Sequence, residues 1–404
     1  MAYFIITITS VLFVFYIYKL RSSGNLVFIL PLYYSFTVLY VLIGLYIFNY
    51  AKEVPFDIYS LVYDEYVINS AKLYVLSSFS FCLGAMFFSR NGNVRAKNNS
   101  VQADFKYQKL LLLLSVSIFV LYVFSYGIEP LIYRVGYISS EHERNKYGSI
   151  VFYLTSPFIF VLMPFIKRKF LRILFFVVFF LALFSSSSRF LVMLPFLYLV
   201  GVYIKNRKLP LTILFLHLSM IAGGLMFVLQ IRYYQYHGLI PNIASFFSKG
   251  IDYDYIFVGL NYAFSFSLMG TAYVLKGFTF DINSFFISIN PLPSMFVDIE
   301  YMLSTQQMLP TAPISAISLL SLSGYLGLVV FYITTGCFFS YSLSKFKGQN
   351  IVYYIILGLF VMFTLFSIQY NLRGLTRFLY YSILLHVFYL AWIQFVKFFK
   401  KESR

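Results

Sequence analysis

Residues 170–200 read FLRILFFVVFFLALFSSSSRFLVMLPFLYLV, two apolar runs joined by the polar tip SSSSR at 185–189. An apolar helix crosses a bilayer with about 20 residues, and somewhat shorter runs are tolerated. Three consecutive bases, 167–169, precede the first run, and Lys205 follows the second. Bases at both open ends of a hairpin and a short polar turn at its tip indicate two membrane spans with the tip outside.

The composition of the whole chain is typical of a membrane protein. Of its 404 residues, 60% are hydrophobic and only 11% are charged, and the mean hydropathy is +0.80. A soluble domain carries about 25% charged residues, so the apolar surface exceeds what one core can bury. The net charge of +17 comes from short basic clusters between apolar runs, which indicates membrane topology rather than a nucleic-acid groove. We expect no nucleic-acid partner.

Eleven apolar runs predict an all-α polytopic membrane protein. They cover residues 2–18, 26–48, 73–89, 110–126, 150–166, 170–186, 190–204, 209–230, 313–340, 351–369 and 378–396. The first run has no basic segment before it and no small-residue cleavage site after it, so we expect a retained helix rather than a signal peptide. Gly223-Gly224 in the eighth run predicts close helix packing.

The distribution of charge orients these spans. With the connection at Lys19 and Arg21 inside, 20 of the 31 Lys and Arg residues but only two acidic residues fall on the cytoplasmic side. The outer side then holds the other 11 bases together with 12 acidic residues. Because positively charged loops stay in the cytoplasm, we expect the N-terminus outside and the C-terminus inside.

The chain is predicted to be a single integral membrane domain, 1–404, with one large outer loop, 231–312. This loop contains a further apolar run, 255–275, which would invert every later loop if it crossed the membrane alone. We therefore expect interfacial or re-entrant helices in the loop, or a pair of spans that includes 283–296. Long connections of this kind are usually functional.

Four arginines at outer helix ends oppose the positive-inside trend, namely Arg189, Arg232, Arg373 and Arg377. Arg373 and Arg377 are four residues apart and would share one face of a helix. Guanidinium groups form bidentate, charge-assisted hydrogen bonds with phosphate, so the four are predicted to bind a diphosphate, with the serines of the tip as further donors. The alternative is that each arginine extends to a lipid headgroup.

The start of the outer loop carries a group of aromatic residues and a histidine. Tyr233, Tyr234 and Tyr236 are predicted to bind sugars, because aromatic rings stack on the apolar faces of sugars. The alternative for these tyrosines is an aromatic belt at the membrane interface. His237 is a candidate general base, since its ordinary pKa is close to neutrality.

Two acidic residues of the loop are further candidate bases. Asp298 and Glu300 follow the turn Asn290-Pro291-Leu292-Pro293, and either could take the proton of a sugar hydroxyl. The alternative is that both are ordinary solvated loop charges. The sequence contains no H-E-x-x-H motif and no Gly-rich phosphate-binding loop, and we expect no metal and no other cofactor.

In layout the chain resembles the bacterial O-antigen polymerases, the oligosaccharide repeat-unit polymerases called Wzy. The likeness covers most of the chain and rests on about eleven spans, the serine–arginine tip at 185–189 and a span that ends at Arg232. It also rests on three short segments, Asn290-Pro291-Leu292-Pro293-Ser294, Pro310-Thr311-Ala312-Pro313 and Ser323-Gly324-Tyr325-Leu326-Gly327.

The resemblance implies a metal-independent glycosyltransferase of the bacterial inner membrane, with a fold related to GT-C-type enzymes and O-antigen ligases. Such an enzyme joins undecaprenyl-diphosphate-linked oligosaccharides on the periplasmic side, in lipopolysaccharide or related polysaccharide biosynthesis. A Wzz-type chain-length regulator is the expected partner, besides membrane lipids. The four arginines would hold the diphosphates, and one of the three candidate bases would activate the acceptor hydroxyl.

Two other functions stay open at this point. A flippase for lipid-linked oligosaccharides would have short loops and charges lining a cavity between two similar halves, whereas here the charges gather at one face. An O-antigen ligase has a similar layout and uses the same donor. The absence of acidic residues in the middle of any predicted span disfavours an ion-coupled carrier.

Overall fold

The computed structural model describes residues 29–50, 62–89, 108–136, 145–187, 189–206, 210–231, 234–250, 252–292, 296–309, 312–346 and 351–402. Contacts between Cα atoms divide the chain into two compact units. Unit 1 combines Met1–Lys97 with Asn261–Arg404, and unit 2 is Asn98–Leu260. Two units can lie within one membrane domain, so the single domain 1–404 stays a prediction.

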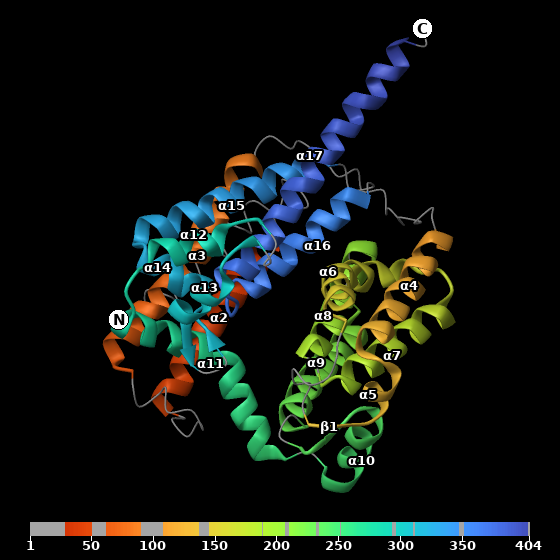
Figure 1. Cartoon of the computed structure of the whole chain (residues 1–404), viewed down its shortest axis with the longest axis horizontal. Coiled ribbons are helices and arrows are strands. Elements are labelled where there is room, and N and C mark those ends of the chain that lie inside the picture. Colours follow the sequence, from red (N-terminus) through yellow and green to blue (C-terminus); the bar gives the residue numbers. More distant parts are fainter. Residues whose placement is uncertain are drawn as a thin grey trace. The chain divides into compact units, whose positions relative to one another are not determined.

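Both units are built from helices (Figure 1). Unit 2 contains α4 (Gln108–Tyr126), α5 (Ile128–Ile132), β1 (Arg134–Val135), α6 (Lys146–Leu162), η3 (Met163–Phe165), α7 (Lys169–Ser185), η4 (Arg189–Val192), α8 (Met193–Asn206), α9 (Leu211–Ile231), β2 (Tyr236–His237) and α10 (Leu239–Lys249). Unit 1 contains α2 (Ile29–Tyr50), α3 (Asp64–Ser89), α12 (Ile282–Ile289), α13 (Ile299–Gln306), β3 (Gln307–Leu309), β4 (Ala312–Pro313), α14 (Ala316–Leu322), α15 (Tyr325–Lys345), α16 (Ile351–Phe366) and α17 (Leu372–Glu402). Between them in sequence, α11 (Tyr253–Gly277) belongs partly to each.

Every predicted run within the described residues contains a helix, whereas the run 2–18 lies outside them. Five helical segments there are long and apolar enough to cross a membrane: Asp64–Phe87, Gln108–Tyr126, Tyr147–Phe165, Tyr325–Lys345 and Leu372–Phe395. Shorter apolar helices cover Tyr33–Asn49, Phe190–Val202, Leu211–Gly224 and Ile355–Phe366. The fold is thus that of an all-α membrane protein, while the total of eleven spans and the GT-C-like arrangement stay predictions.

The predicted span 313–340 is divided into two helices. Ser315 begins α14, and its Oγ accepts a hydrogen bond from Ser318 N at 3.2 Å, which is typical of a helix N-cap. The chain breaks between α14 and α15 at Gly324, whose φ of +98° suits a residue without a side chain. The apolar run therefore forms a short helix and a separate long one.

The apolar run 255–275 forms the greater part of α11, a continuous helix of 25 residues. The following helix, α12, has only 8 residues and is about 12 Å long, which is too short to cross a bilayer core of about 30 Å. A pair of spans that includes 283–296 is therefore not formed. Whether α11 is interfacial or re-entrant stays a prediction.

The helices of unit 2 have two chemically different ends. At one end, which we call the basic end, Lys205 Nζ donates to Pro164 O at 2.7 Å beside the bases 167–169. At the other, the serine end, Arg134 NH1 donates to Ser185 O at 2.9 Å. The long helices α4, α6, α7, α8 and α9 run alternately between these ends, as the predicted topology requires. Which end faces the cytoplasm stays a prediction.

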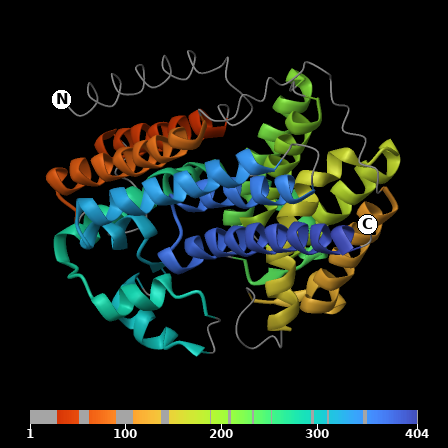
Figure 2. The same ribbon diagram turned by 90° about the horizontal axis from the view of Figure 1, so that it is seen from above.

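In unit 1, α3 and α15 lie side by side (Figure 2) and approach closely through glycines. A Cβ atom at Gly84 would overlap Ile333 O, and a Cβ atom at Gly336 would overlap Phe81 O. Cys337 Sγ donates to Gly84 O at 3.1 Å. Small residues allow this approach between membrane helices, where packing rather than water drives association.

The prediction that Gly223-Gly224 marks close helix packing is wrong. Among the described residues, no atom lies within 4 Å of a Cβ placed on Gly223. A Cβ on Gly224 would make only an ordinary contact with Leu191, at 3.4 Å. A pair of adjacent glycines therefore did not mark the helix interface, whereas the separate glycines of α3 and α15 form one.

Inside unit 1, buried hydroxyl groups form hydrogen bonds with one another. Thr271 Oγ1 lies 2.7 Å from Ser318 Oγ and 3.3 Å from the hydroxyl of Tyr74. The hydroxyl of Tyr332 lies 2.6 Å from Ser367 Oγ. All five side chains are buried, and in an interior without water such groups must find partners on neighbouring helices.

We predict that Gly84→Leu destabilises the protein by about 1–3 kcal/mol or more, because the new side chain must separate α3 from α15. The matched control is Gly223→Ala, which fills open space in a helix and should leave stability unchanged or raise it by up to about 1 kcal/mol. Thermal unfolding in detergent, followed by scanning fluorimetry, measures both. An equal melting temperature for the two variants would contradict the close contact.

Candidate functional site

The serine tip of unit 2 is buried and largely satisfied by its own helix. Ser185 Oγ donates to Ala182 O at 2.8 Å, and Ser186 Oγ donates to Leu183 O at 2.9 Å. These two hydroxyls therefore already use their protons, although the sequence predicted them as donors to a diphosphate. Ser187 differs, since its φ of +52° turns the chain sharply away from α7. Ser188 lies outside the described residues.

Ser187 meets the candidate base His237. The Oγ atom of Ser187 lies 3.5 Å from His237 Nδ1, and both side chains are fully buried. His237 is held there by the antiparallel β1–β2 ribbon, in which it pairs with Arg134 while Tyr236 pairs with Val135. Neighbouring residues of a strand point to opposite faces, so Arg134 and His237 face inward and Val135 and Tyr236 face outward.

Two further residues join this group that the sequence did not single out. Arg134 NH1 donates to Pro130 O and to Ser185 O, each at 2.9 Å. Asn242 Nδ2 donates to Phe184 O at 2.9 Å and lies 3.4 Å from Ser187 Oγ. The only sequence signals were a base in an outer loop and a polar residue within an apolar helix. We call Arg134, Ser187, His237 and Asn242 the serine-end cluster.

The electrostatic environment keeps His237 neutral. Burial lowers the pKa of the imidazole from its ordinary value, and the positive charge of Arg134 lowers it further. A hydrogen bond with the backbone of Tyr234 opposes both effects. At neutral pH the ring therefore carries no charge and has a nitrogen able to accept a proton.

The predicted sugar-binding tyrosines have different surroundings. Tyr234 accepts a hydrogen bond from Gln230 Nε2 at 2.7 Å, and Lys249 Nζ lies 4.3 Å from the centre of its ring. Tyr236 is exposed and stacks on Tyr133, with ring centres 5.8 Å apart. Tyr236 therefore offers a ring face to a ligand more readily than Tyr234 does.

Three predicted residues of unit 2 have no described side chain. Arg189 begins the short helix η4 directly after the serine tip, but only its backbone is described. Arg232 and Tyr233 lie outside the described residues. Their roles stay predictions based on the sequence.

Arg373 of unit 1 is buried and bound to backbone carbonyls. Its NH1 donates to Ile287 O at 2.7 Å and to Asn290 O at 3.3 Å, and its NH2 donates to Leu292 O at 2.8 Å. Carbonyls at the end of a helix have no partner within it. Arg373 therefore ends α12 and holds the turn that follows, and a diphosphate could bind its NH1 and NH2 only in place of these bonds.

Neighbouring side chains of α17 complete the clamp on α12. Thr376 Oγ1 lies 3.4 Å from Ser288 O, and the hydroxyl of Tyr380 donates to Ile289 O. Together with Arg373, they follow the 3–4 residue spacing that places side chains on one face of a helix. Arg377, in contrast, is exposed. The two predicted arginines of α17 thus have different environments, and Arg377 is the one accessible to a ligand.

The acidic candidates lie at the start of α13 and are exposed. Asp298 is the N-cap of this helix, with Oδ1 accepting a hydrogen bond from Tyr301 N at 2.9 Å. Glu300 stands in the first turn. Nearby, Asp281 accepts hydrogen bonds from Ser284 N and from the hydroxyl of Tyr301. These two bonds hold the pKa of Asp281 below its usual value.

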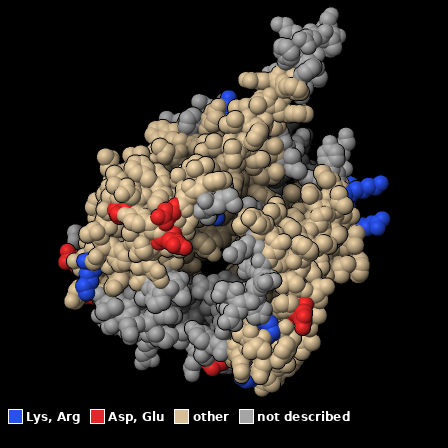
Figure 3. All heavy atoms as spheres, viewed as in Figure 1, with Lys and Arg blue, Asp and Glu red and all other residues tan. Residues whose placement is uncertain are grey.

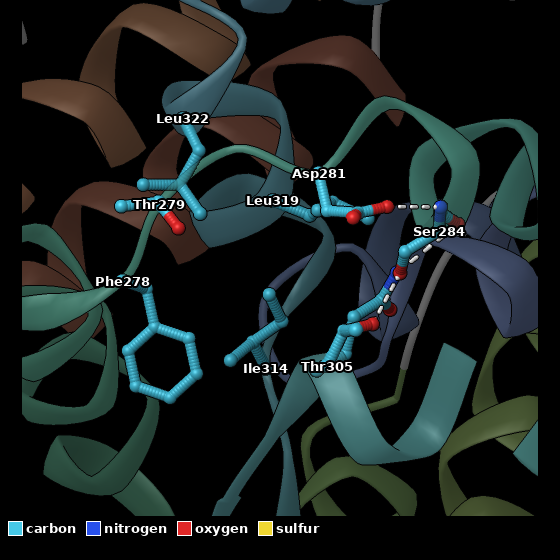
Figure 4. Close-up of a pocket in the computed structure, with 9 residues that line it drawn as sticks. Phe278, Thr279, Asp281, Ser284, Thr305, Ile314, Leu319 and Leu322 are labelled. Carbon is cyan, nitrogen blue, oxygen red and sulfur yellow. Dashed lines mark hydrogen bonds between the residues drawn. The ribbon is translucent and has the colours of Figure 1, made fainter. Parts of the chain in front are cut away.

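A small pocket lies beside α12 in unit 1 (Figure 4). Figure 4 shows Phe278 and Ile314 on its apolar side and Asp281, Ser284 and Thr305 on its polar side. The pocket has room for about one water molecule. It is too small to hold a sugar ring in this conformation.

We predict that Arg373→Ala lowers the stability of the protein, because Asn290 O and Leu292 O lose the guanidinium donor and Ile287 O keeps only the N–H of Asn290. A hydrogen bond from a charged group contributes about 1.5–3 kcal/mol. Arg377→Ala, the matched exposed arginine, should change stability by no more than about 0.5 kcal/mol. Thermal unfolding and limited proteolysis of the turn after α12 measure the difference. Equal losses in the two variants would refute the clamp.

The pKa of His237 predicts a pH dependence of stability. Because its folded-state pKa lies below that of the unfolded chain, its contribution is complete above about pH 6.5 and is lost as the pH falls through the folded-state pKa. The melting temperature should therefore fall on acidification, and His237→Asn should reduce this slope. Identical slopes for both proteins would show that His237 is protonated equally easily in the folded and unfolded states.

Comparison with known proteins identifies no relative of this chain. No protein-family model matches it, no curated protein matches it, and no solved structure matches it. In the part of the chain that the structure describes, no group of three or more His, Cys, Asp or Glu side chains is placed to hold a metal ion. The functional argument therefore rests on the side chains themselves.

Proposed function

We propose that the chain polymerises oligosaccharide repeat units carried on undecaprenyl diphosphate, at the periplasmic face of the bacterial inner membrane. The observation that carries this proposal is the 3.5 Å approach of His237 Nδ1 to Ser187 Oγ. This contact joins a residue of the predicted outer loop to the serine–arginine tip, and these two features were proposed from the sequence independently of each other. His237 contributes a neutral imidazole beside the serine tip, and in the sequence this tip continues into Arg189.

The proposed reaction needs one base and one anion-binding group. A hydroxyl of the acceptor sugar loses its proton to the base, and its oxygen forms a bond with the anomeric carbon of the donor. The bond from this carbon to the diphosphate breaks, and the lipid diphosphate leaves with the electron pair. Arginines stabilise the charge that develops on the leaving group, so the proposed chemistry requires no metal.

Accessibility distinguishes the three candidate bases. His237 is fully buried, so a sugar hydroxyl reaches it only after the β1–β2 ribbon moves. Asp298 and Glu300 are exposed at the start of α13 and reach a ligand without such a movement. We retain all three as candidates and test them by the replacements His237→Asn, Asp298→Asn and Glu300→Gln, which remove the base; the last two also preserve the size of the side chain.

Accessibility also ranks the proposed diphosphate ligands. Arg377 is exposed and therefore accessible to an anion. Arg373 already bonds three carbonyls, so we assign it a structural role in addition to the predicted one. Arg189 and Arg232 remain proposed ligands in unit 2. Tyr236, with its exposed ring, is the first candidate for contact with the sugar.

We predict that Arg232→Gln and Arg377→Gln each reduce long-chain polymer by about 10- to 100-fold, since a charge-assisted hydrogen bond contributes about 1.5–3 kcal/mol. Single repeat units should persist at the cell surface. The matched control is Arg168→Gln, an exposed arginine at the basic end, which should leave the polymer unchanged. Gel ladders of the surface glycan, normalised to the amount of each variant in the membrane, measure the effect.

The same ladders separate the alternatives. Unchanged long chains in both Arg232→Gln and Arg377→Gln would reject the diphosphate role. Loss of single units as well, on deletion of the chain, would indicate a flippase. Full-length polymer that stays on the lipid carrier would indicate an O-antigen ligase. A Wzz-type regulator enters the proposal as the partner that sets chain length.

A further inference from the structure

The amphipathic helix α10 exposes its apolar face and buries a polar residue, whereas a helix at the surface of a soluble protein does the reverse. Its apolar residues Ile240, Ile243, Ala244 and Phe247 follow the spacing of one helix face, and all four are exposed. The exposed fraction reaches 60% for Ile240 and 81% for Phe247. The buried residue on the opposite face is the polar Asn242. A soluble protein would direct the apolar stripe toward its core.

The position of α10 explains this orientation. Asn242, near its beginning, donates to Phe184 O at the end of α7. Phe246, one turn later, packs on Phe227 of α9, with ring centres 5.2 Å apart. The helix therefore lies across the ends of two apolar helices rather than extending from them. If α7 and α9 cross the membrane, α10 lies along its surface.

The apolar surface continues beyond α10 at the same end of unit 2. The outward face of the ribbon exposes Val135 and the stacked pair Tyr133 and Tyr236, and α5 exposes Ile128 and Ile132. Tyrosines are enriched where an apolar region meets water. Apolar side chains from separate parts of the chain are thus exposed at the serine end.

Among the elements of this surface, α5 exposes one acidic residue, Glu129. Lys249, in the last turn, is the one charged residue of α10, and a lysine at this place can keep its ammonium group in water while the helix contacts lipid. Figure 3 shows some acidic and basic side chains in the region where Figure 1 labels α5, β1 and α10, among a majority of uncharged ones. The apolar side of α4 is similarly exposed, with Phe124 at 71% near its end on this side.

We infer that the apolar stripe of α10 is embedded in the bilayer leaflet at the serine end. The partner is the lipid surface itself, at the boundary between headgroups and acyl chains. Contact with lipid would cover the stripe and keep Asn242, on the opposite face, in contact with the serine tip. This inference concerns how the cluster is held and does not depend on the proposed transfer reaction.

The single tryptophan of the chain, Trp392, permits a direct test. In a Trp392→Phe background, Phe247→Trp places a reporter on the stripe. Phe124→Trp on α4 is the control for lipid contact, and Glu65→Trp, at an exposed acidic position, is the control for water contact. Each variant is placed as a single chain in nanodiscs with or without phospholipid brominated on its acyl chains, and aqueous iodide is the second quencher.

The reporter at position 247 should lose fluorescence to brominated lipid as the Phe124→Trp control does, and should be protected from iodide. Quenching by iodide but not by brominated lipid, as for Glu65→Trp, would overturn the inference and indicate a stripe that faces water or awaits another protein. Protection from both quenchers would also overturn it, because the stripe would then be covered by protein within the single chain. The melting temperatures of the three variants establish that each is folded.

Discussion

Buried guanidinium groups that satisfy backbone carbonyls hold helix ends and turns together in each unit. In unit 1, Arg373 bonds the carbonyls of residues 287, 290 and 292. In unit 2, Arg134 bonds those of residues 130 and 185. Helix ends leave carbonyls without partners, and where protein or lipid excludes water each one raises the free energy of the fold. A planar guanidinium offers several donors at once, so one side chain can end a helix and position the turn beside it.

This constraint gives arginines at helix ends two possible roles. The same position suits a guanidinium that bonds carbonyls and one that binds an external anion, because both ligands are oxygen acceptors. Arg373 and Arg377 are only four residues apart, yet the first is buried in the clamp on α12 and the second is exposed. Burial and existing partners, rather than position in the sequence, therefore decide which arginine is available to a ligand.

At the serine end, α10 and the β1–β2 ribbon each have a polar face directed inward and an apolar face directed outward. One face of α10 presents Asn242 to the serine tip, while its other face is apolar and exposed. The β1–β2 ribbon has the same division, with Arg134 and His237 inward and Val135 and Tyr236 outward. A ribbon of two residue pairs is a weak attachment, and small elements of this kind open more easily than the long helices beneath them.

The sequence by itself determined the class of the protein and the location of its helices. Apolar runs with few charges must be helical in lipid because no other open structure satisfies the backbone there, and each run within the described residues contains a helix. Helix ends were less predictable, since α3 begins at Asp64 and α17 at Leu372, beyond the apolar runs and among charged residues. Helices continue past the hydrocarbon where water or side chains satisfy their ends.

Only the tertiary structure decided how individual polar residues are used. The pairing of Ser187 with His237, the capture of Arg373 by α12 and the orientation of α10 all join residues far apart in the chain. The period of a helix identifies its apolar face, but it does not say whether protein or lipid covers that face. Nor does it say which carbonyl an arginine will reach. These outcomes depend on contacts between elements, which hydrophobicity along a single chain does not encode.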